Sequence, residues 1–276
     1  MRLSTIRTVA LAGLALLWLA GGASAQAPDA PTVPQRSRER PWLGVRYDLD
    51  LVSGLSEAWQ ELSVEFARPV GDAMLIARGR GARRFGLYGT QVEGEAYPRF
   101  GARTYLYLGA AASPSATVYP PLRVAAEAYR ALPAGWEASA GGRFVRTTGT
   151  NLATYTGTVA RYVGNYWVSA RPSLTVYDGQ RARALAGVAR RYFSGRHDYL
   201  SLSASASAGA DPEARDPQRL SRSSELRGWA LHVDRLQPLG RDVRVRYGAG
   251  YEREETAPSA VRSHRAIVLG IDWVMP

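Results

Sequence analysis

An acid/base site can be built from a histidine and a carboxylate that share one face, and the chain offers one such pair. His232 and Asp234 are two residues apart, so in a strand they point the same way. A hydrolase or acyltransferase would also need a nucleophile beside the histidine, and no spacing marks one. Ser263 precedes His264 directly and would point to the opposite face. We therefore expect lumen hydrogen bonding rather than catalysis at His232.

Other catalytic chemistry has little support in the sequence. The chain contains no cysteine, which excludes thiol catalysis, disulfides and cysteine metal sites. His197 is followed by Asp198, but we place that pair in a turn. No glycine-rich phosphate loop and no metal-ligand spacing appears. We expect no catalytic residues, no metal site and no cofactor, and hence a protein that is not an enzyme.

Charged residues recur at every second position of several segments. Because a strand places alternate side chains on one face, we predict that these residues face a common interior, the lumen of a barrel. Their mixed signs predict a network of ion pairs across that lumen. The predicted lumen-lining residues are Arg46, Asp48, Asp50, Glu61, Glu65, Glu93, Glu95, Glu127, Glu137, Arg143, Arg171, His232, Asp234, Arg244 and Arg246.

The elements that would carry these residues are segments of about ten residues that alternate apolar and polar side chains. Tyr199–Ala208 shows the pattern clearly, with leucine and alanine at one parity and serine at the other. We predict an all-β, transmembrane, antiparallel up-and-down β-barrel of about fourteen strands, with twelve or sixteen as alternatives. The strands are Trp42–Leu51, Trp59–Ala67, Ala73–Gly81, Gly86–Tyr97, Leu106–Ala110, Leu122–Ala131, Trp136–Arg146, Leu152–Tyr162, Tyr166–Tyr177, Ala182–Tyr192, Tyr199–Ala208, Leu226–Leu236, Val243–Glu252 and His264–Val274.

The links between these segments support the same architecture. Links after even-numbered strands are short and contain glycine, as periplasmic hairpin turns require, and the long links Ser113–Pro121 and Asp211–Ser224 follow odd-numbered strands. We interpret Arg78–Arg84 as an arginine-rich link. Pro172 lies inside a predicted strand and suggests a bulge, since proline cannot donate to the ladder. Only Asp211–Ser224 has the length to fold inward as a plug.

Aromatic residues gather near the ends of the apolar bands. Such residues form girdles at membrane interfaces, where the ring is apolar and its polar tip stays wet. The predicted girdle residues are Trp42, Trp59, Tyr97, Tyr105, Trp136, Tyr162, Tyr166, Tyr177, Tyr192, Tyr199 and Trp273.

The N-terminus predicts export. Arg2 and Arg7 precede an apolar stretch that ends at Ala23-Ser24-Ala25, which is typical of a signal peptide cleaved after Ala25. We predict a signal peptide over residues 1–25, a proline-rich disordered periplasmic lead-in over 26–40 and the barrel over 41–276. The predicted location is the outer membrane of a Gram-negative cell.

The chain is strongly basic, and all of its basic residues are arginine. The formal net charge is +11, or +9 once Arg2 and Arg7 are removed. An exported protein has little access to nucleic acid, so we expect none as a partner. The expected partners are outer-membrane lipid and lipopolysaccharide, whose phosphates pair with arginine, and the barrel-assembly machinery during insertion. Lumen arginines either attract anionic solutes or balance lumen carboxylates.

Several short motifs resemble the YaiO family of outer-membrane β-barrels. They are Leu43-Gly44-Val45-Arg46-Tyr47-Asp48, Arg78-Gly79-Arg80, Tyr177-Asp178-Gly179, Arg191-Tyr192-Phe193 and Gly270-Ile271-Asp272-Trp273. The resemblance covers nearly the whole mature chain. It implies an outer-membrane location and supplies no catalytic residues.

Three functions remain open at this point. A barrel of about fourteen strands is wider than an eight-stranded one, whose side chains fill its interior, so the first is a channel or export conduit for small polar solutes or saccharides. The second is a structural or interaction barrel whose lumen is closed by its own ion pairs. The third, which the sequence favours least, is a lipid-modifying outer-membrane enzyme.

Overall fold

The computed structural model describes residues 40–209, 227–257 and 260–276. The predicted signal peptide, nearly all of the lead-in and the link Asp211–Ser224 lie outside the described residues. The elements, in chain order, are β1 Trp42–Val52, β2 Trp59–Val70, β3 Ala73–Arg84, β4 Leu87–Tyr97, β5 Arg99–Phe100, β6 Thr104–Ala112, β7 Leu122–Ala131, η1 Pro133–Gly135, β8 Trp136–Arg146, β9 Asn151–Val163, β10 Tyr166–Tyr177, β11 Gln180–Gly195, β12 Asp198–Ala208, β13 Arg227–Pro238, β14 Val243–Ala257 and β15 Ala260–Val274.

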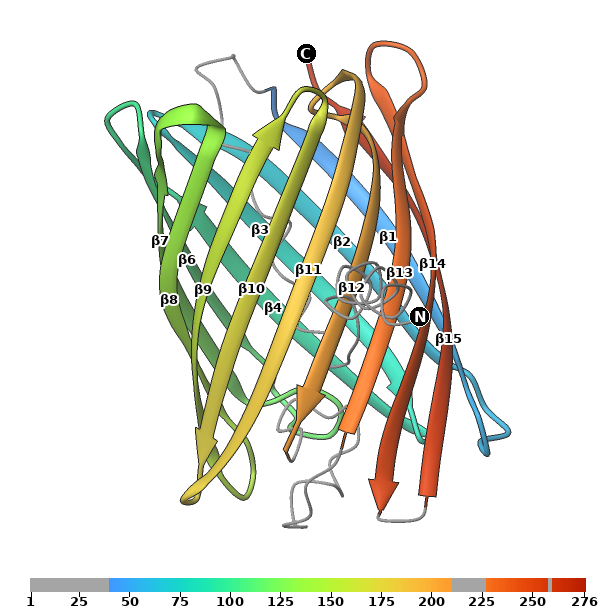
Figure 1. The fold of residues 1–276 in the computed structure, drawn as a ribbon. Helices are drawn as coiled ribbons and strands as arrows, with labels where there is room; N and C mark the ends of the chain where they lie inside the picture. Colours follow the sequence, from blue (N-terminus) through green and yellow to red (C-terminus); the bar gives the residue numbers. More distant parts are fainter. Residues whose placement is uncertain (1–39, 210–226, 258–259) are drawn as a thin grey trace, which may run out of the picture.

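These strands form one closed antiparallel sheet, and Figure 1 shows it as a barrel whose strands are tilted. Sequence neighbours pair around the barrel, β1 pairs with β15, and the pairing of β4 with β6 completes the circle. The predicted barrel of fourteen antiparallel strands is confirmed, with the two-residue β5 as a short addition beside β6. Within the described ranges, no helical segment has both the length and the hydropathy of a membrane-spanning helix.

The two-residue period of the sequence decides which side chains face outward. On β2, Leu62 and Val64 are exposed on the outer surface, at 51% and 45%. Ser63, which lies between them, is buried on the inner wall. An apolar outer band against a polar inner wall is the arrangement that lipid outside and water inside select.

Two predictions about strand interiors are wrong. Arg78–Arg84 is not a link, because β3 continues through Arg84 and pairs with β2 and β4 over its whole length. Its alternate arginines point inward, where neighbouring strands supply carboxylates. Pro172 causes no bulge, since β10 keeps one register against both β9 and β11 on either side of it.

The two ends of the barrel differ in their connections. The start of β1 and the end of β15 lie at one end, which is periplasmic by the rule for bacterial barrels. At the opposite, extracellular end, Asp178-Gly179 joins β10 to β11. Asp178 and Gly179 have φ values of 45° and 76°, the left-handed conformation of a tight hairpin turn.

The seam between β4 and β6 predicts a specific crosslink. Gly94 lies directly opposite Ala110, so Gly94→Cys with Ala110→Cys should form an intramolecular disulfide in the folded protein. The measurement is mobility on non-reducing gels after mild oxidation. Gly94→Cys with Ala111→Cys is the control, because these side chains point to opposite faces. An open seam, or equal crosslinking of both pairs, would contradict the closure.

Candidate functional site

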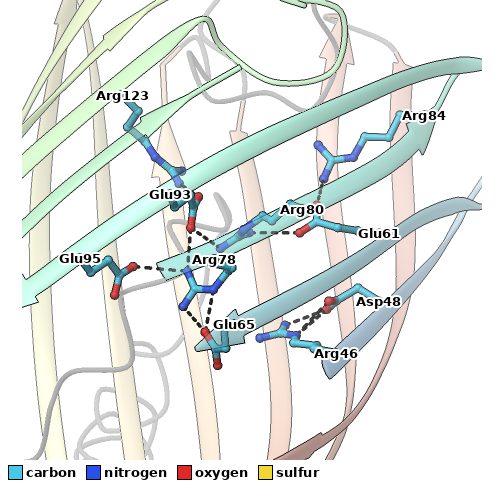
Figure 2. A network of polar contacts seen from close by, with 10 residues as sticks. All are labelled: Arg46, Asp48, Glu61, Glu65, Arg78, Arg80, Arg84, Glu93, Glu95 and Arg123. Atoms are coloured by element: carbon cyan, nitrogen blue, oxygen red, sulfur yellow. Dashed lines mark hydrogen bonds and ion pairs between the residues drawn. The ribbon is translucent and has the colours of Figure 1, made fainter. Parts of the chain in front are cut away.

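The inner wall of β1–β4 carries a continuous network of arginine and carboxylate side chains, shown in Figure 2. Arg78 Nη2 lies 2.5 Å from Glu65 Oε2, and Arg78 Nη1 lies 2.7 Å from Glu93 Oε2. Arg80 joins Glu93 to Glu61 at 3.0 and 3.1 Å. The network thus runs from strand to strand, because the register places opposite charges facing each other on neighbouring strands.

Glu93 is the most connected member of this network. Its side chain is only 3% exposed and accepts hydrogen bonds from Arg78, Arg80 and Arg123. Arg123 comes from β7, so Glu93 links the wall of β3 and β4 to the strands beyond the β4–β6 seam. Such a buried carboxylate is tolerated only because three guanidinium groups surround it.

Two pockets open beside the network, on the inner face of the barrel. One, of about 100 Å³, is lined by Arg46, Asp48, Glu61, Glu65 and Arg246, among other residues. Arg46 and Asp48 form a two-pronged pair there, with bonds of 2.7 and 2.9 Å. The second, of about 60 Å³, is lined by Arg123 and Arg143 together with Glu93 and Glu95. Both pockets present charges of both signs.

The wall opposite, formed by β9–β12, carries small hydroxyl side chains on β9, β10 and β12, alanines on β11 and aromatic side chains near the strand ends. Two arginines, Arg171 and Arg190, also lie at inner positions of this wall. Arg171 lies 2.5 Å from Glu127 on β7 and donates to Thr158 Oγ1 at 3.2 Å. Thr154 and Thr175 hydrogen-bond across β9 and β10 at 2.9 Å. The hydroxyl residues at inner positions are Thr154, Thr156, Thr158, Ser169, Ser173, Thr175, Ser201, Ser203, Ser205 and Ser207.

His232 and Asp234 occupy inner positions of β13 opposite glycines of β14. His232 pairs with Gly250 and Asp234 with Gly248. A Cβ at either glycine would collide with the facing side chain, so both side chains lie against the β14 backbone. The glycines therefore make room for these polar groups on the wall.

His264 lies on the inner wall near the extracellular end, between two carboxylates. Its Nδ1 is 3.0 Å from Asp50 Oδ2, and its Nε2 is 3.1 Å from Glu254 Oε1. Both nitrogens can donate to these oxygens only when the ring is protonated. A ring held in this way is a structural cation rather than a general base.

His197, in the turn between β11 and β12, has the opposite environment. Its Nδ1 lies 2.8 Å from Arg244 Nη1, which places the predicted lumen residue Arg244 at the periplasmic end. Burial, together with the charges of Arg244 and Arg196, lowers the pKa of His197 to about 3. The ring is therefore neutral at ordinary pH.

The predicted aromatic girdle is mostly wrong. Trp136, Tyr166 and Trp273 face outward and are about half exposed. The remaining predicted girdle residues lie at inner positions, where most of them pack against another aromatic ring or an arginine. These are Trp42, Trp59, Tyr97, Tyr105, Tyr162, Tyr177, Tyr192 and Tyr199.

Most of these inner aromatic residues gather at the periplasmic end. Tyr105 stacks on Tyr129 with centroids 4.6 Å apart, and both rings are 1% exposed. Arg190 lies 4.1 Å above the Tyr199 ring. Packed in this way, the aromatic side chains occupy lumen volume along β6–β12 and narrow the periplasmic end.

The link 113–121 between β6 and β7 bends back over the extracellular end. Ser113 Oγ and Thr117 Oγ1 donate to the carbonyls of Thr90 and Tyr88. Val118 packs against Gly89, and the buried Tyr119 ring lies 5.7 Å from Arg84. Burial and the adjacent Glu61 carboxylate raise the pKa of Tyr119, which stays protonated. Folding of this link into the lumen mouth was not expected from the sequence.

The inner wall as a whole is close to neutral, because arginines and carboxylates occur there in nearly equal number. The arginines are Arg46, Arg78, Arg80, Arg84, Arg99, Arg123, Arg143, Arg171, Arg190, Arg244, Arg246 and Arg262, and His264 adds one cation. The carboxylates are Asp48, Asp50, Glu61, Glu65, Glu93, Glu95, Glu127, Glu137, Asp234, Glu252, Glu254 and Asp272. The basic excess of the described residues therefore lies on the outer face and in the turns.

Sequence reasoning missed several arginines of the network, namely Arg78, Arg80, Arg84 and Arg123. The signal that identifies the first three is present in the sequence: Arg78, Arg80 and Arg84 share one parity in a segment that otherwise holds glycine, alanine and one further arginine. A glycine-rich arginine segment can be a strand when neighbouring strands supply its counter-charges.

Known proteins resemble the chain in sequence pattern and in fold. A family model described as "YaiO membrane beta barrel domain" matches residues 42–213. No curated protein sequence matches. A "Bacterial polysaccharide outer membrane secretin" shares 9% identity over 86% of this chain and 99% of that chain, with a TM-score of 0.56.

Two other outer-membrane barrels are similar in fold. The "CymD monoaromatic hydrocarbon channel" shares 6% identity over 86% of this chain and 89% of its own, with a TM-score of 0.54. OccK7 (OpdD) of Pseudomonas aeruginosa shares 8% identity over 86% and 98%, with a TM-score of 0.52. At these identities the likeness concerns the fold alone.

Replacing Glu93 with glutamine tests the network. Glu93→Gln leaves Arg78, Arg80 and Arg123 without their shared counter-charge, and we expect the free energy of unfolding to fall by about 3 kcal/mol. Asp48→Asn is the matched control, because the Arg46 and Asp48 side chains are 30% and 28% exposed and should contribute less than about 1 kcal/mol. Urea unfolding in detergent measures both, and equal losses would contradict a central role for Glu93.

Proposed function

We propose, from the premise that this chain belongs to the YaiO membrane β-barrel family, that it is an outer-membrane conduit for uncharged or zwitterionic polar solutes, including saccharides. The observation that carries the proposal is the composition of the inner wall. Its arginines and carboxylates occur in nearly equal number around the barrel and pair with each other on β1–β4, while β9, β10 and β12 add small hydroxyl groups on the wall opposite.

This arrangement suits solutes that form many hydrogen bonds and carry little net charge. Hydroxyl side chains both donate and accept hydrogen bonds and reorient easily. Paired arginines and carboxylates offer the same groups to a passing solute while producing little long-range field. A lumen that concentrated anions would need unbalanced arginines, and the chain carries its excess positive charge elsewhere.

The proposal includes no catalysis. Both ring nitrogens of His264 face carboxylates, and His197 lies among arginines. His232 and Asp234 rest against the β14 backbone. The proteins of similar fold include a channel and a polysaccharide secretin. This similarity supports the proposal only to the extent that a barrel of this fold can contain a conduit.

A second candidate, a barrel with a self-closed lumen that acts through its surfaces, has one specific observation in its favour. The aromatic residues packed around Tyr105 and Tyr129 occupy the periplasmic end along β6–β12. If they extend fully across the opening, the protein conducts no ions.

Planar-bilayer recordings distinguish these functions. We expect stable single-channel steps and, in a salt gradient, a reversal potential close to zero, because the lumen charges balance. Strong anion selectivity would contradict the charge balance of the inner wall. Complete absence of conductance at all voltages would favour the self-closed barrel.

Tyr119 should control the size of the extracellular opening. Tyr119→Ala removes the ring that anchors the link 113–121 against Arg84, so we expect a larger single-channel conductance. Tyr88→Ala is the control, because Tyr88 is 70% exposed at the nearby end of β4 and faces outward. An unchanged conductance in Tyr119→Ala, or the same change in Tyr88→Ala, would exclude this link as a constriction.

A further inference from the structure

The outer face near the extracellular ends of β13–β15 carries a cluster of exposed arginines. Arg227, Arg253 and Arg265 lie on adjacent strands, each displaced by two residues from the position opposite its neighbour. Diagonal neighbours of this kind lie about 7–8 Å apart. Arg183 on β11 lies in the same cross-strand row as Arg227, with Ala208 between them.

Two aromatic side chains lie beside the cluster, an arrangement typical of a membrane interface. Trp229 is directly opposite Arg253, and Tyr251 is directly opposite Arg265. The two rings contact each other at 5.3 Å, as an interfacial aromatic pair does. Nearer the middle of the barrel, Leu231 and Ile267 continue the same outer face and are more than 40% exposed.

The charge of the cluster is offset by no more than one carboxylate within the described part of the chain. Among the described residues, none of the four guanidinium groups has an ion-pair partner. Arg83, another outward arginine at this end, instead lies 3.0 Å from Glu57. Glu255 is the one described carboxylate on the outer face beside the cluster, and it accepts a hydrogen bond from the backbone N–H of Arg227.

We propose that Arg227, Arg253 and Arg265, assisted by Arg183, bind the phosphate groups of lipopolysaccharide in the outer leaflet. Arginine matches phosphate oxygens with two parallel N–H donors, and several guanidinium groups on neighbouring strands can hold a headgroup that carries more than one phosphate. The apolar face next to Trp229 and Tyr251 receives the acyl chains. This proposal does not depend on whether the lumen conducts.

The test compares two triple variants of the full-length protein refolded without lipopolysaccharide. Arg227→Gln/Arg253→Gln/Arg265→Gln should weaken binding of purified lipopolysaccharide by at least about tenfold, since each charge-assisted hydrogen bond contributes to binding. Arg130→Gln/Arg161→Gln/Arg191→Gln is the matched control. It removes the same charge from exposed outward positions at the periplasmic end and should leave affinity near that of the parent protein. Native mass spectrometry counts the bound lipid.

Further probes separate a phosphate site from general attraction to anions. Dephosphorylated lipopolysaccharide should bind the parent and the first variant equally weakly. Parent-like affinity of the first variant, an equal loss in the control, or equally tight binding of phosphatidylglycerol to the parent would each overturn the proposal. Heat-modifiable mobility on gels shows whether the triple variant has folded. If it has not, Arg253→Gln alone should still weaken lipopolysaccharide binding. Single-channel conductance should be the same in every variant.

Discussion

Backbone hydrogen bonding in lipid is the constraint on which the rest of this structure depends. An unpaired N–H or C=O group in the hydrocarbon region costs several kcal/mol, so a membrane-spanning sheet must close on itself. Here closure comes from two long-range pairings, β1 with β15 and β4 with β6. Once the sheet is closed, each strand has one face toward lipid and one toward the lumen. The two-residue alternation of the sequence is then a partition of side chains, with apolar residues facing lipid and polar residues facing the interior.

That partition accounts for the charge network. Arginines on the inner wall cannot reach lipid phosphates, and a charge removed from bulk water needs a partner. The register supplies those partners from neighbouring strands, as with Arg78 between Glu65 and Glu93. The same requirement explains the glycines opposite His232 and Asp234, since polar side chains pressed against the wall need space that a Cβ would occupy. Local sequence and cross-strand pairing therefore specify one inner surface together.

Much of the barrel architecture can be predicted from the sequence. The predictions that are wrong share a cause, which is that they depend on contacts between strands. The alternation of apolar and polar residues predicted most strand boundaries to within a few residues of the observed ones. It does so because each strand has two faces in different environments, and this gives the sequence a two-residue period. It failed at Arg78–Arg84, where charge density suggested a link although β2 and β4 hold the counter-charges. It also failed for the aromatic residues, because an interface and a packed lumen end both select tyrosine and tryptophan. The inward bend of the link 113–121 depends on contacts with β4 that no local pattern encodes.

The positions of the charged residues on the barrel determine how the basic composition should be interpreted. A net charge of +11 suggests a lumen that attracts anions when the chain is considered as a whole. On the barrel, the inner wall is close to neutral and the outward arginines lie near the ends of strands, as Arg130, Arg161, Arg191, Arg227, Arg253 and Arg265 do. At these positions a guanidinium group remains hydrated while its aliphatic stem contacts the apolar band. The basic character is thus a property of the outer face of the barrel and of its turns, whereas the inner wall carries paired charges and hydroxyl groups.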